Sequence, residues 1–429
     1  ETMTVTGSIA SDGGASQSSF SGGGSGGSIY IECKSFVLTG SLRCNGGASS
    51  SPGGGGAGGR IIIYFQTGDY HSGYVQAKGG AGAEPGGPGI AYFHGNDVRH
   101  LRVDNKCQKP SVTEPSGDHA NQGDYYAYTA TGAIAYLLPG MDDFEYDFTL
   151  VEVYGNAHLT FDKNRTRVKV FRMVGDDTGH VHVPPFHILE ITEINRYQRL
   201  NVTYKPFIYE KATWILPDGI VEIRQSLNEA GLGLNPSACG ISSLSSNTVR
   251  TWGKIVGNKA HLLVASGMTL IMELHELREV QFSNVTIQDG ALLELRSYYG
   301  NVSDQWELKV LREGYVSMLT VEGGGTLLAS NLHITSDIVK VDAAGVLSVS
   351  GGGLKDGSGV GVGSGGAGYG GQGGLGGTSG SQPGSVYGSL YMPDEYGSGG
   401  SGATTSIGTG KKCITVAGKD KKISLYGTQ

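Results

Sequence analysis

The segment Gly22-Gly-Gly-Ser-Gly-Gly-Ser-Ile-Tyr-Ile31 returns as Gly54-Gly-Gly-Ala-Gly-Gly-Arg-Ile-Ile-Ile63, and Thr6-Gly-Ser8 returns as Thr39-Gly-Ser41. Thirty-two or thirty-three residues separate the copies, and a third, eroded copy runs from Val75 to Tyr92. Each copy contains β-branched residues, a turn, a glycine tract and another apolar strand. This pattern indicates one supersecondary unit that is repeated along the chain.

A shorter period follows further along the chain, with the same order of two apolar residues, a turn containing Gly and another apolar residue. A period of about 20 residues with very short strands favours one coil of a parallel β-helix, in which apolar residues form inward-pointing ladders. We therefore predict that Val321 stacks on Val341, and Leu327 on Leu347, in the core. The sets are Leu262, Val264, Gly267 and Leu270; Val285, Ile287, Gly290 and Leu292; Leu319, Val321, Gly325 and Leu327; and Val339, Val341, Gly345 and Leu347.

The composition suits a folded chain that is unusually rich in glycine. Glycine supplies 74 of 429 residues, and 38% of the chain is hydrophobic, which is enough to bury a core. Two glycine-rich regions, 1–92 and 340–429, flank a middle region, 93–339, that holds most charges and aromatic residues. We predict an all-β, right-handed parallel β-helix that continues through all three regions. A separate β-sandwich in the middle region is the alternative, because its strand spacing looks the same.

Long glycine tracts can pack backbone to backbone, because they carry no Cβ. The tracts Pro52–Gly59, Gly79–Gly89 and Gly357–Gly380 are long enough to lie along the solenoid as close-packed loops. For Gly357–Gly380 a flexible linker is an equal alternative.

The charge and hydropathy of the chain exclude two classes of partner. The net charge is −7 with no long basic run, so nothing attracts nucleic acid or an anionic membrane surface. The most apolar stretch, Ala260–Leu277, is interrupted by polar residues and predicts no membrane span. The sequence starts at Glu1 without a signal peptide, so we expect a processed chain or a piece of a longer one.

Four sequons predict N-linked glycans and therefore secretion to the extracellular space or cell surface: Asn164, Asn201, Asn284 and Asn301. Alternation with buried Val and Ile turns Asn201 and Asn284 outward. Asn301 follows the turn composition Tyr299-Gly300, whereas the parity of Asn164 matches that of Val168 and Val170 and predicts that it points inward.

Five cysteines lack any metal-binding spacing: Cys33, Cys44, Cys107, Cys239 and Cys413. In a secreted protein they predict disulfides with at least one thiol left over. Buried free thiols in a reducing cytosol are the alternative.

The segments Gly22–Ile31, Ser41–Ala48 and Gly54–Ile63, with the tail Tyr387–Gly400, resemble the glycine-rich parallel β-helix modules of very large secreted proteins in protists and other eukaryotes. Leu101–Asn105, and Leu319–Val321 into Val339–Gly345, are similar to the rungs between those tracts. The resemblance implies a surface, matrix or fibrous role and brings no catalytic residues.

The acidic and histidine clusters are the candidates for a catalytic or metal site. Asp142, Asp143 and Asp147, and Asp176 and Asp177 beside Arg165 and Arg167, have turn compositions and no spacing that stacks acids on one face. Apart from Asp176 and Asp177, no further ligand is visible near His180, His182 and His187, which favours a surface strand with exposed histidines over a metal site. We therefore predict no catalytic residue, no metal and no cofactor.

The two ends of the chain look like halves of one repeat unit. When the C-terminus precedes the N-terminus, Leu425 matches Ile29, Tyr426 matches Tyr30, Met3 matches Phe36 and Val5 matches Leu38. A contact between ends that does not close propagates into a filament.

These features predict a structural subunit of an extracellular fibre, coat or appendage, for example a flagellar hair or surface filament. Its partner is itself, as separate head-to-tail subunits or as tandem repeats of a longer chain, and Cys413 is the first candidate to lock the junction. A carbohydrate-binding adhesin using Tyr125, Tyr126 and Tyr128 is the alternative. A β-helix polysaccharide lyase or hydrolase is a further alternative.

Overall fold

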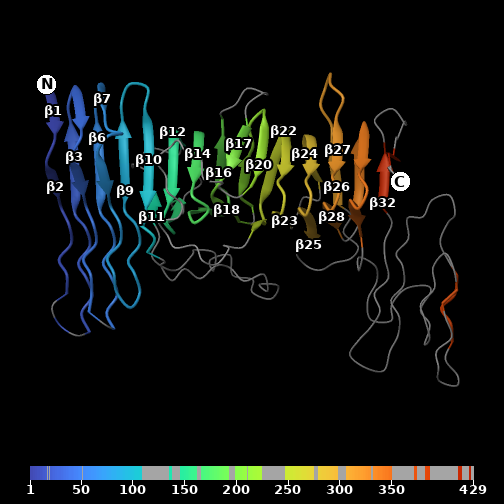
Figure 1. The fold of residues 1–429 in the computed structure, drawn as a ribbon, viewed down its shortest axis with the longest axis horizontal. Coiled ribbons are helices and arrows are strands. Elements are labelled where there is room, and N and C mark those ends of the chain that lie inside the picture. The colour runs from blue at the N-terminus through green and yellow to red at the C-terminus, as the bar shows by residue number, and fades with distance from the viewer. Residues whose placement is uncertain are drawn as a thin grey trace. The chain divides into compact units, whose positions relative to one another are not determined.

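The computed structural model consists of β-strands, with no helix among the residues that it describes (Figure 1). The chain divides into two compact units, Glu1–Ile255 and Val256–Gln429. This boundary falls inside the predicted middle region, 93–339. The described residues are 1–108 except 17, 19 and 51, then 135–137, 145–161, 166–192, 199–209, 211–224, 247–274, 279–297, 306–329, 332–349, 372–373, 382–386, 414–417 and 425–426. Within them, no helix has the length and apolarity needed to cross a membrane.

The first strands of the first unit stack in three parallel columns, β1-β4-β7, β2-β5-β8 and β3-β6-β9. The repeats seen in the sequence lie directly on one another: Ile29 pairs with Ile61, and Ser8 pairs with Ser41. The predicted repeat register is therefore confirmed. The strands are β1 (Thr2–Val5), β2 (Ser8–Ala10), β3 (Ser28–Glu32), β4 (Ser35–Leu38), β5 (Ser41–Arg43), β6 (Arg60–Tyr64), β7 (Thr67–Asp69), β8 (Tyr74–Gln76) and β9 (Ile90–His94).

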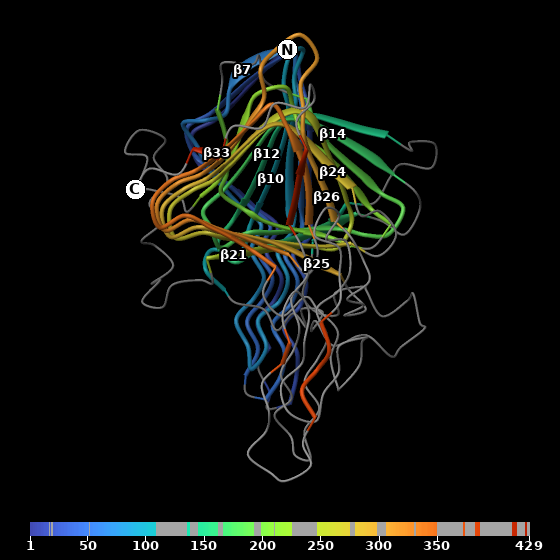
Figure 2. The same ribbon diagram turned by 90° about the vertical axis from the view of Figure 1, so that its right-hand side faces the viewer.

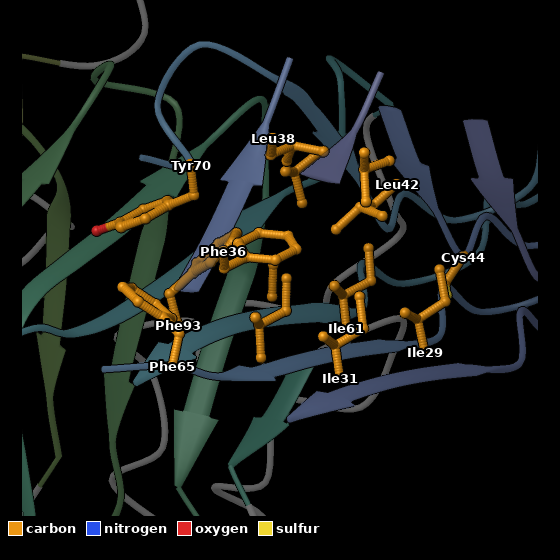
Figure 3. Packing of buried hydrophobic residues seen from close by; sticks show 14 of the residues in the cluster. Ile29, Ile31, Phe36, Leu38, Leu42, Cys44, Ile61, Phe65, Tyr70 and Phe93 are labelled. Atoms are coloured by element: carbon orange, nitrogen blue, oxygen red, sulfur yellow. The ribbon is translucent and has the colours of Figure 1, made fainter. Parts of the chain in front are cut away.

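The three columns enclose one apolar core, which Figure 3 shows from close by. The strands alternate, so Ile61 and Ile63 are fully buried while Arg60 and Tyr64 point outward. Phe36 and Leu38 of β4 and Leu42 of β5 complete the same layer of the core.

Glycine tracts leave these columns as wavy, extended arms and pack backbone to backbone (Figure 1). The N–H of Gly47 donates to the carbonyl of Gly24 at 2.7 Å, and the N–H of Gly56 donates to that of Gly47 at 3.0 Å. The N–H of Gly80 continues this series to Gly56 at 2.7 Å. A Cβ at Gly80 would overlap the carbonyl oxygen of Gly47, so only glycine allows this spacing.

Close packing is thus confirmed for the tracts Pro52–Gly59 and Gly79–Gly89. The tract Gly357–Gly380 lies outside the described residues except for 372–373, where Gly373 donates to the carbonyl of Gly384 at 2.9 Å.

The rest of the first unit continues with parallel pairing, β10-β12-β14-β16 in one sheet and β11-β13-β15-β18 in another. An antiparallel sandwich in this stretch does not occur among the described pairings. The strands are β10 (Arg99–Asp104), β11 (Ala135–Leu137), β12 (Glu145–Tyr154), β13 (His158–Phe161), β14 (Arg167–Gly175), β15 (His180–Val183), β16 (Ile188–Ile191), β17 (Arg199–Val202), β18 (Lys205–Ile208), β19 (Thr213–Ile215), β20 (Ile220–Ile223) and β21 (Thr248–Thr251).

The buried side of the sheet changes where β9 meets β10. These two strands pair antiparallel, with Phe93 opposite His100 and Tyr92 opposite Leu101. Residues directly opposite in an antiparallel pair share a face. Phe93 and Leu101 are both buried but lie on opposite faces, so a second core begins at Leu101. Leu101 then pairs with buried Val151 of β12.

The second unit also stacks in parallel columns, including β24-β27-β30-β33 and β23-β25-β28-β31. Val321 pairs with Val341, and Leu327 pairs with Leu347, as predicted. The strands are β22 (Lys254–Val264), which begins at the boundary, β23 (Thr269–Leu274), β24 (Glu279–Ile287), β25 (Leu292–Ser297), β26 (Trp306–Val310), β27 (Met318–Val321), β28 (Thr326–Ala329), β29 (Leu332–Ser336), β30 (Ile338–Val341), β31 (Val346–Ser348), β32 (Ile414–Ala417) and β33 (Leu425–Tyr426).

The prediction that Leu292 belongs to the inward-pointing ladder was wrong. Leu270 pairs with Leu293 rather than Leu292, and Leu293 is the fully buried one of the two. Strand side chains alternate between faces, so a shift of one residue moves the chain from core to surface. Val341 and Leu347, in the last described strands before residue 350, are half-buried.

Candidate assembly end of the first coil

The first coil has strand edges without partners in the described chain. β1 and β2 stand at the ends of their columns, and β3 pairs only with β6 among the described pairings. Met3 and Val5 therefore lie on the first rung, where Met3 pairs with Phe36 and Val5 with Leu38. An edge of this kind presents backbone donors and acceptors that can pair with another strand.

The core at this end is also partly uncovered. Met3 and Ile9 are half-buried, whereas Phe36 and Leu42, their partners one coil inward, are fully buried. The first coil therefore has apolar side chains, Met3 and Ile9, at the positions that pair with Phe36 and Leu42. The apolar ladder thus ends facing outward, which favours stacking of a further coil.

The other end of the same core is closed by polar side chains. Tyr70 stacks on Phe93 with ring centroids 4.3 Å apart, and its hydroxyl lies 3.2 Å from His100 Nδ1. His100 Nε2 lies 2.8 Å from Glu152 Oε2, and the Tyr154 hydroxyl donates to Glu152 Oε1 at 3.1 Å. We call Tyr70, His100, Glu152 and Tyr154 the closing cluster.

Tyr70, His100 and Tyr154 of the closing cluster are buried, and burial shifts pKa values within the cluster. Burial raises the pKa of Glu152, but the hydrogen bond from His100, the nearby His100 and Arg102 charges and the Tyr154 hydroxyl outweigh it, so its pKa is lowered. Burial, with the nearby Glu152 charge, raises the pKa of Tyr70 to about 12. The carboxylate form of Glu152 is therefore the stable one in this cluster.

At the other end of the chain, Leu425 and Tyr426 form β33. Leu425 pairs with Val339, and Tyr426 with Lys340, so β33 extends the column of β30 by one coil. The match of these residues with Ile29 and Tyr30 stays a prediction.

The sequons fall on described strands at two positions. Asn201 lies in β17 opposite Glu222, and its neighbour Val202 is buried. Asn284 is half-buried, and its Oδ1 accepts a 2.8 Å hydrogen bond from the backbone N–H of Met318. Asn164 and Asn301 lie outside the described residues. Glycosylation remains a prediction at all four positions.

Two disulfide candidates are corrected. Cys33 and Cys44 are free thiols. Cys44 points into the core of the first unit (Figure 3), and Cys33, the residue after β3, is half-buried. Burial raises the pKa of Cys44 to about 11. Cys107 is not a free thiol. Cys239 and Cys413 lie outside the described residues.

The histidines predicted to be exposed are buried. His180 Nδ1 lies 3.0 Å from His158 Nε2, and His158 Nδ1 lies 2.9 Å from His182 Nε2. His182 Nδ1 lies 2.9 Å from the Tyr209 hydroxyl, and His187 is also buried. Strand parity alone does not reveal this, because β13 and β15 are buried on both faces.

These imidazoles form a hydrogen-bonded ladder across the stacked strands β13 and β15, which ends at Tyr209 directly after β18. Burial lowers the pKa of His158 to about 4 and that of His182 to about 3, with added repulsion from Lys205 and His158 respectively. Hydrogen bonds between these neutral imidazoles hold β13 and β15 in register. Among the described residues, no cluster of three or more His, Cys, Asp or Glu is arranged to hold a metal ion.

The acidic candidates lie in turns or in ion pairs where they are described. Asp176 accepts hydrogen bonds from Thr178 N at 3.1 Å and Gly155 N at 2.9 Å, which confirms the turn at Asp176-Asp177. Asp147 pairs with Arg99 at 3.0 Å, and Arg167 Nε donates to Glu190 at 2.8 Å. Asp142, Asp143 and Arg165 lie outside the described residues, as do Tyr125, Tyr126 and Tyr128.

The chain matches no protein-family model, no curated protein and no solved structure.

Sequence reasoning missed the closing cluster. Its signal is the run Arg99-His-Leu-Arg-Val-Asp104, in which charged residues and His alternate with Leu and Val. A strand with apolar residues on one face and charged residues on the other suits a position where one core ends and another begins.

Proposed function

We propose that this chain is a structural subunit of an extracellular fibre, coat or appendage, built by stacking one repeat on the next. The single observation that carries the proposal is the difference between the two ends of the first core. One end is closed by His100 and Glu152, whereas the other ends on half-buried Met3 and Ile9 beside unpaired strand edges. An uncovered apolar end of a solenoid favours the addition of a further coil.

We further propose that the stacked strands wind as a right-handed parallel β-helix. Short strands that stack on one another in parallel register from coil to coil support a solenoid. The right hand follows from the strong preference of parallel crossover connections.

The occupant of the open end, on this proposal, is another repeat of the same chain. The first rung supports it, because Met3 and Val5 stack on Phe36 and Leu38 as one internal coil stacks on the next. A further coil of like sequence would extend both ladders by one rung. The repeat belongs either to a second copy or to the same longer polypeptide.

Secretion and N-linked glycans complete the proposal, with Asn201 and Asn284 as the first acceptors. A disulfide from Cys107 to Cys239 or Cys413 fits the same oxidising compartment, since Cys33 and Cys44 are free.

Sedimentation velocity over a range of concentrations tests self-association. We expect the sedimentation coefficient of the wild-type chain to rise with concentration as oligomers form. Met3→Asp should stay monomeric, because it places a charge on the exposed first rung. Val316→Asp is the matched control, since Val316 is 70% exposed in the second unit. Circular dichroism checks that both variants are folded. A wild-type chain that stays monomeric at every concentration contradicts assembly from separate copies.

A further inference from the structure

A row of tyrosine rings runs along the outer face of β3, β6 and β9. Tyr30 and Tyr64 have ring centroids 5.8 Å apart with planes tilted by 50°, and Tyr64 and Tyr92 follow at 6.4 Å, edge to face. Distances of about 4.5–7 Å are those of aromatic rings in contact. The stacked strands hold these rings together, because β3 pairs with β6 and β6 with β9 in fixed register.

Two of these tyrosines are open to solvent. Tyr30 is 62% exposed and Tyr64 is 36% exposed, while Tyr92 is half-buried. A macromolecular or small-molecule oxidant can therefore reach the Tyr30 and Tyr64 rings from outside. Tyr92 is covered on its other side by Phe148, 6.0 Å away.

The phenol of Tyr30 has a proton acceptor already in place. Its hydroxyl donates a 3.0 Å hydrogen bond to Glu32 Oε2. Loss of one electron from a phenol makes its proton strongly acidic, and a hydrogen-bonded carboxylate accepts that proton without rearrangement. Tyr64 lies beside His94, with ring centroids 5.2 Å apart.

We propose that Tyr30 and Tyr64 are a site of oxidative cross-linking, at which a dityrosine bond joins the first two stacked coils of the chain. The bond would link β3 to β6 covalently, at the end of the core where the strand edges are open. It would stabilise this end without any cysteine.

The oxidant is hydrogen peroxide acting through a haem peroxidase. Each phenol gives up one electron and one proton, with the Tyr30 proton passing first to Glu32, and the peroxide is reduced to two molecules of water. The two phenoxyl radicals couple through ring carbons ortho to the oxygens. The hydrogens on those carbons move to the oxygens, so one carbon–carbon bond forms and two hydrogen atoms are lost in total.

Peroxidase treatment of the purified chain, followed by trypsin digestion and tandem mass spectrometry, tests the proposal. Cleavage after Lys34, Arg60 and Lys78 leaves Tyr30 in peptide 1–34 and Tyr64 in peptide 61–78. We expect these peptides to appear as one species, lighter than their sum by two hydrogen atoms, with fragments that join Tyr30 to Tyr64. The same species must form in dilute monomer, since the bond lies within one chain.

Variants separate this pair from other tyrosines. Tyr30→Phe and Tyr64→Phe should each abolish the joined peptide. Tyr74→Phe is the matched control and should leave the joined peptide unchanged. Tyr74 is also exposed, but it lies in the column β2-β5-β8, and its ring faces the Lys106 ammonium 5.6 Å away. Glu32→Gln should slow its formation severalfold while the fold is retained. Cross-links that form elsewhere, including Tyr64 with Tyr92, while Tyr30 stays unmodified would overturn the proposal.

Discussion

The backbone N–H of Gly80 donates a 2.7 Å hydrogen bond to the carbonyl oxygen of Gly56, and this contact joins two successive glycine arms. The arms are held by main-chain bonds at a spacing that leaves no room for a side chain. Glycine is therefore a packing residue in this part of the molecule.

Gly80→Ala should destabilise the first unit by about 1–3 kcal/mol, because its Cβ would overlap the Gly47 carbonyl oxygen. Gly14→Ala is the control, since a Cβ there meets nothing within 4 Å. Urea unfolding measures both free energies. Equal effects of the two substitutions would mean that the glycine arms are not packed in this way.

Leu293→Ala should lower the free energy of unfolding by about 2–5 kcal/mol, because it leaves a cavity in a fully buried ladder. Leu292→Ala, one residue away on the opposite face, should cost about 1 kcal/mol or less. Chemical denaturation of the two variants compares them directly. A larger loss from Leu292→Ala would show that the register is shifted by one residue.

The free energy of unfolding should fall as the pH drops from about 6.5 towards 4. His158 and His182 have lowered pKa values, about 4 and about 3. In this pH range both imidazoles are therefore protonated in the unfolded chain but stay neutral in the folded chain. Each histidine contributes a slope of up to about 1.4 kcal/mol per pH unit. Urea titrations at several pH values measure it, and His158→Gln should flatten the slope. An unchanged slope in that variant contradicts burial of a neutral imidazole.

Cys44 should resist alkylation in the folded protein, and Cys33 should react before it. Cys44 is fully buried, and its thiol pKa is raised to about 11 chiefly by burial and further by Asp12. Only the thiolate reacts at an appreciable rate. Iodoacetamide labelling at pH 8, read by mass spectrometry, gives the order. Rapid labelling of Cys44 without unfolding would contradict its place in the core.

Sequence period predicted the parallel stacking well, since Ile29 on Ile61 and Val321 on Val341 follow from repeat spacing alone. The period did not predict which strands are buried on both faces. The apolar or polar face of a strand can be read from alternation, but all four residues of β15, His180 and His182 among them, are buried whichever face they lie on. Leu292 was misjudged because two adjacent leucines fit the same period.

The switch of core side at β9 and β10 was equally invisible, because it depends on an antiparallel pair between Phe93 and His100 within otherwise parallel columns. Short-range patterns do not distinguish these two pairings. The open rung at Met3, by contrast, was indicated by its match to Phe36 in the sequence.

Cryo-electron microscopy of the native assembled material tests the central claim most directly. The account predicts a further parallel strand hydrogen-bonded to the outer edge of β3 and an apolar residue of the next repeat packed on Met3 and Ile9. Density in which these edges and Met3 face solvent, with subunits joined elsewhere or dispersed as single particles, would contradict it.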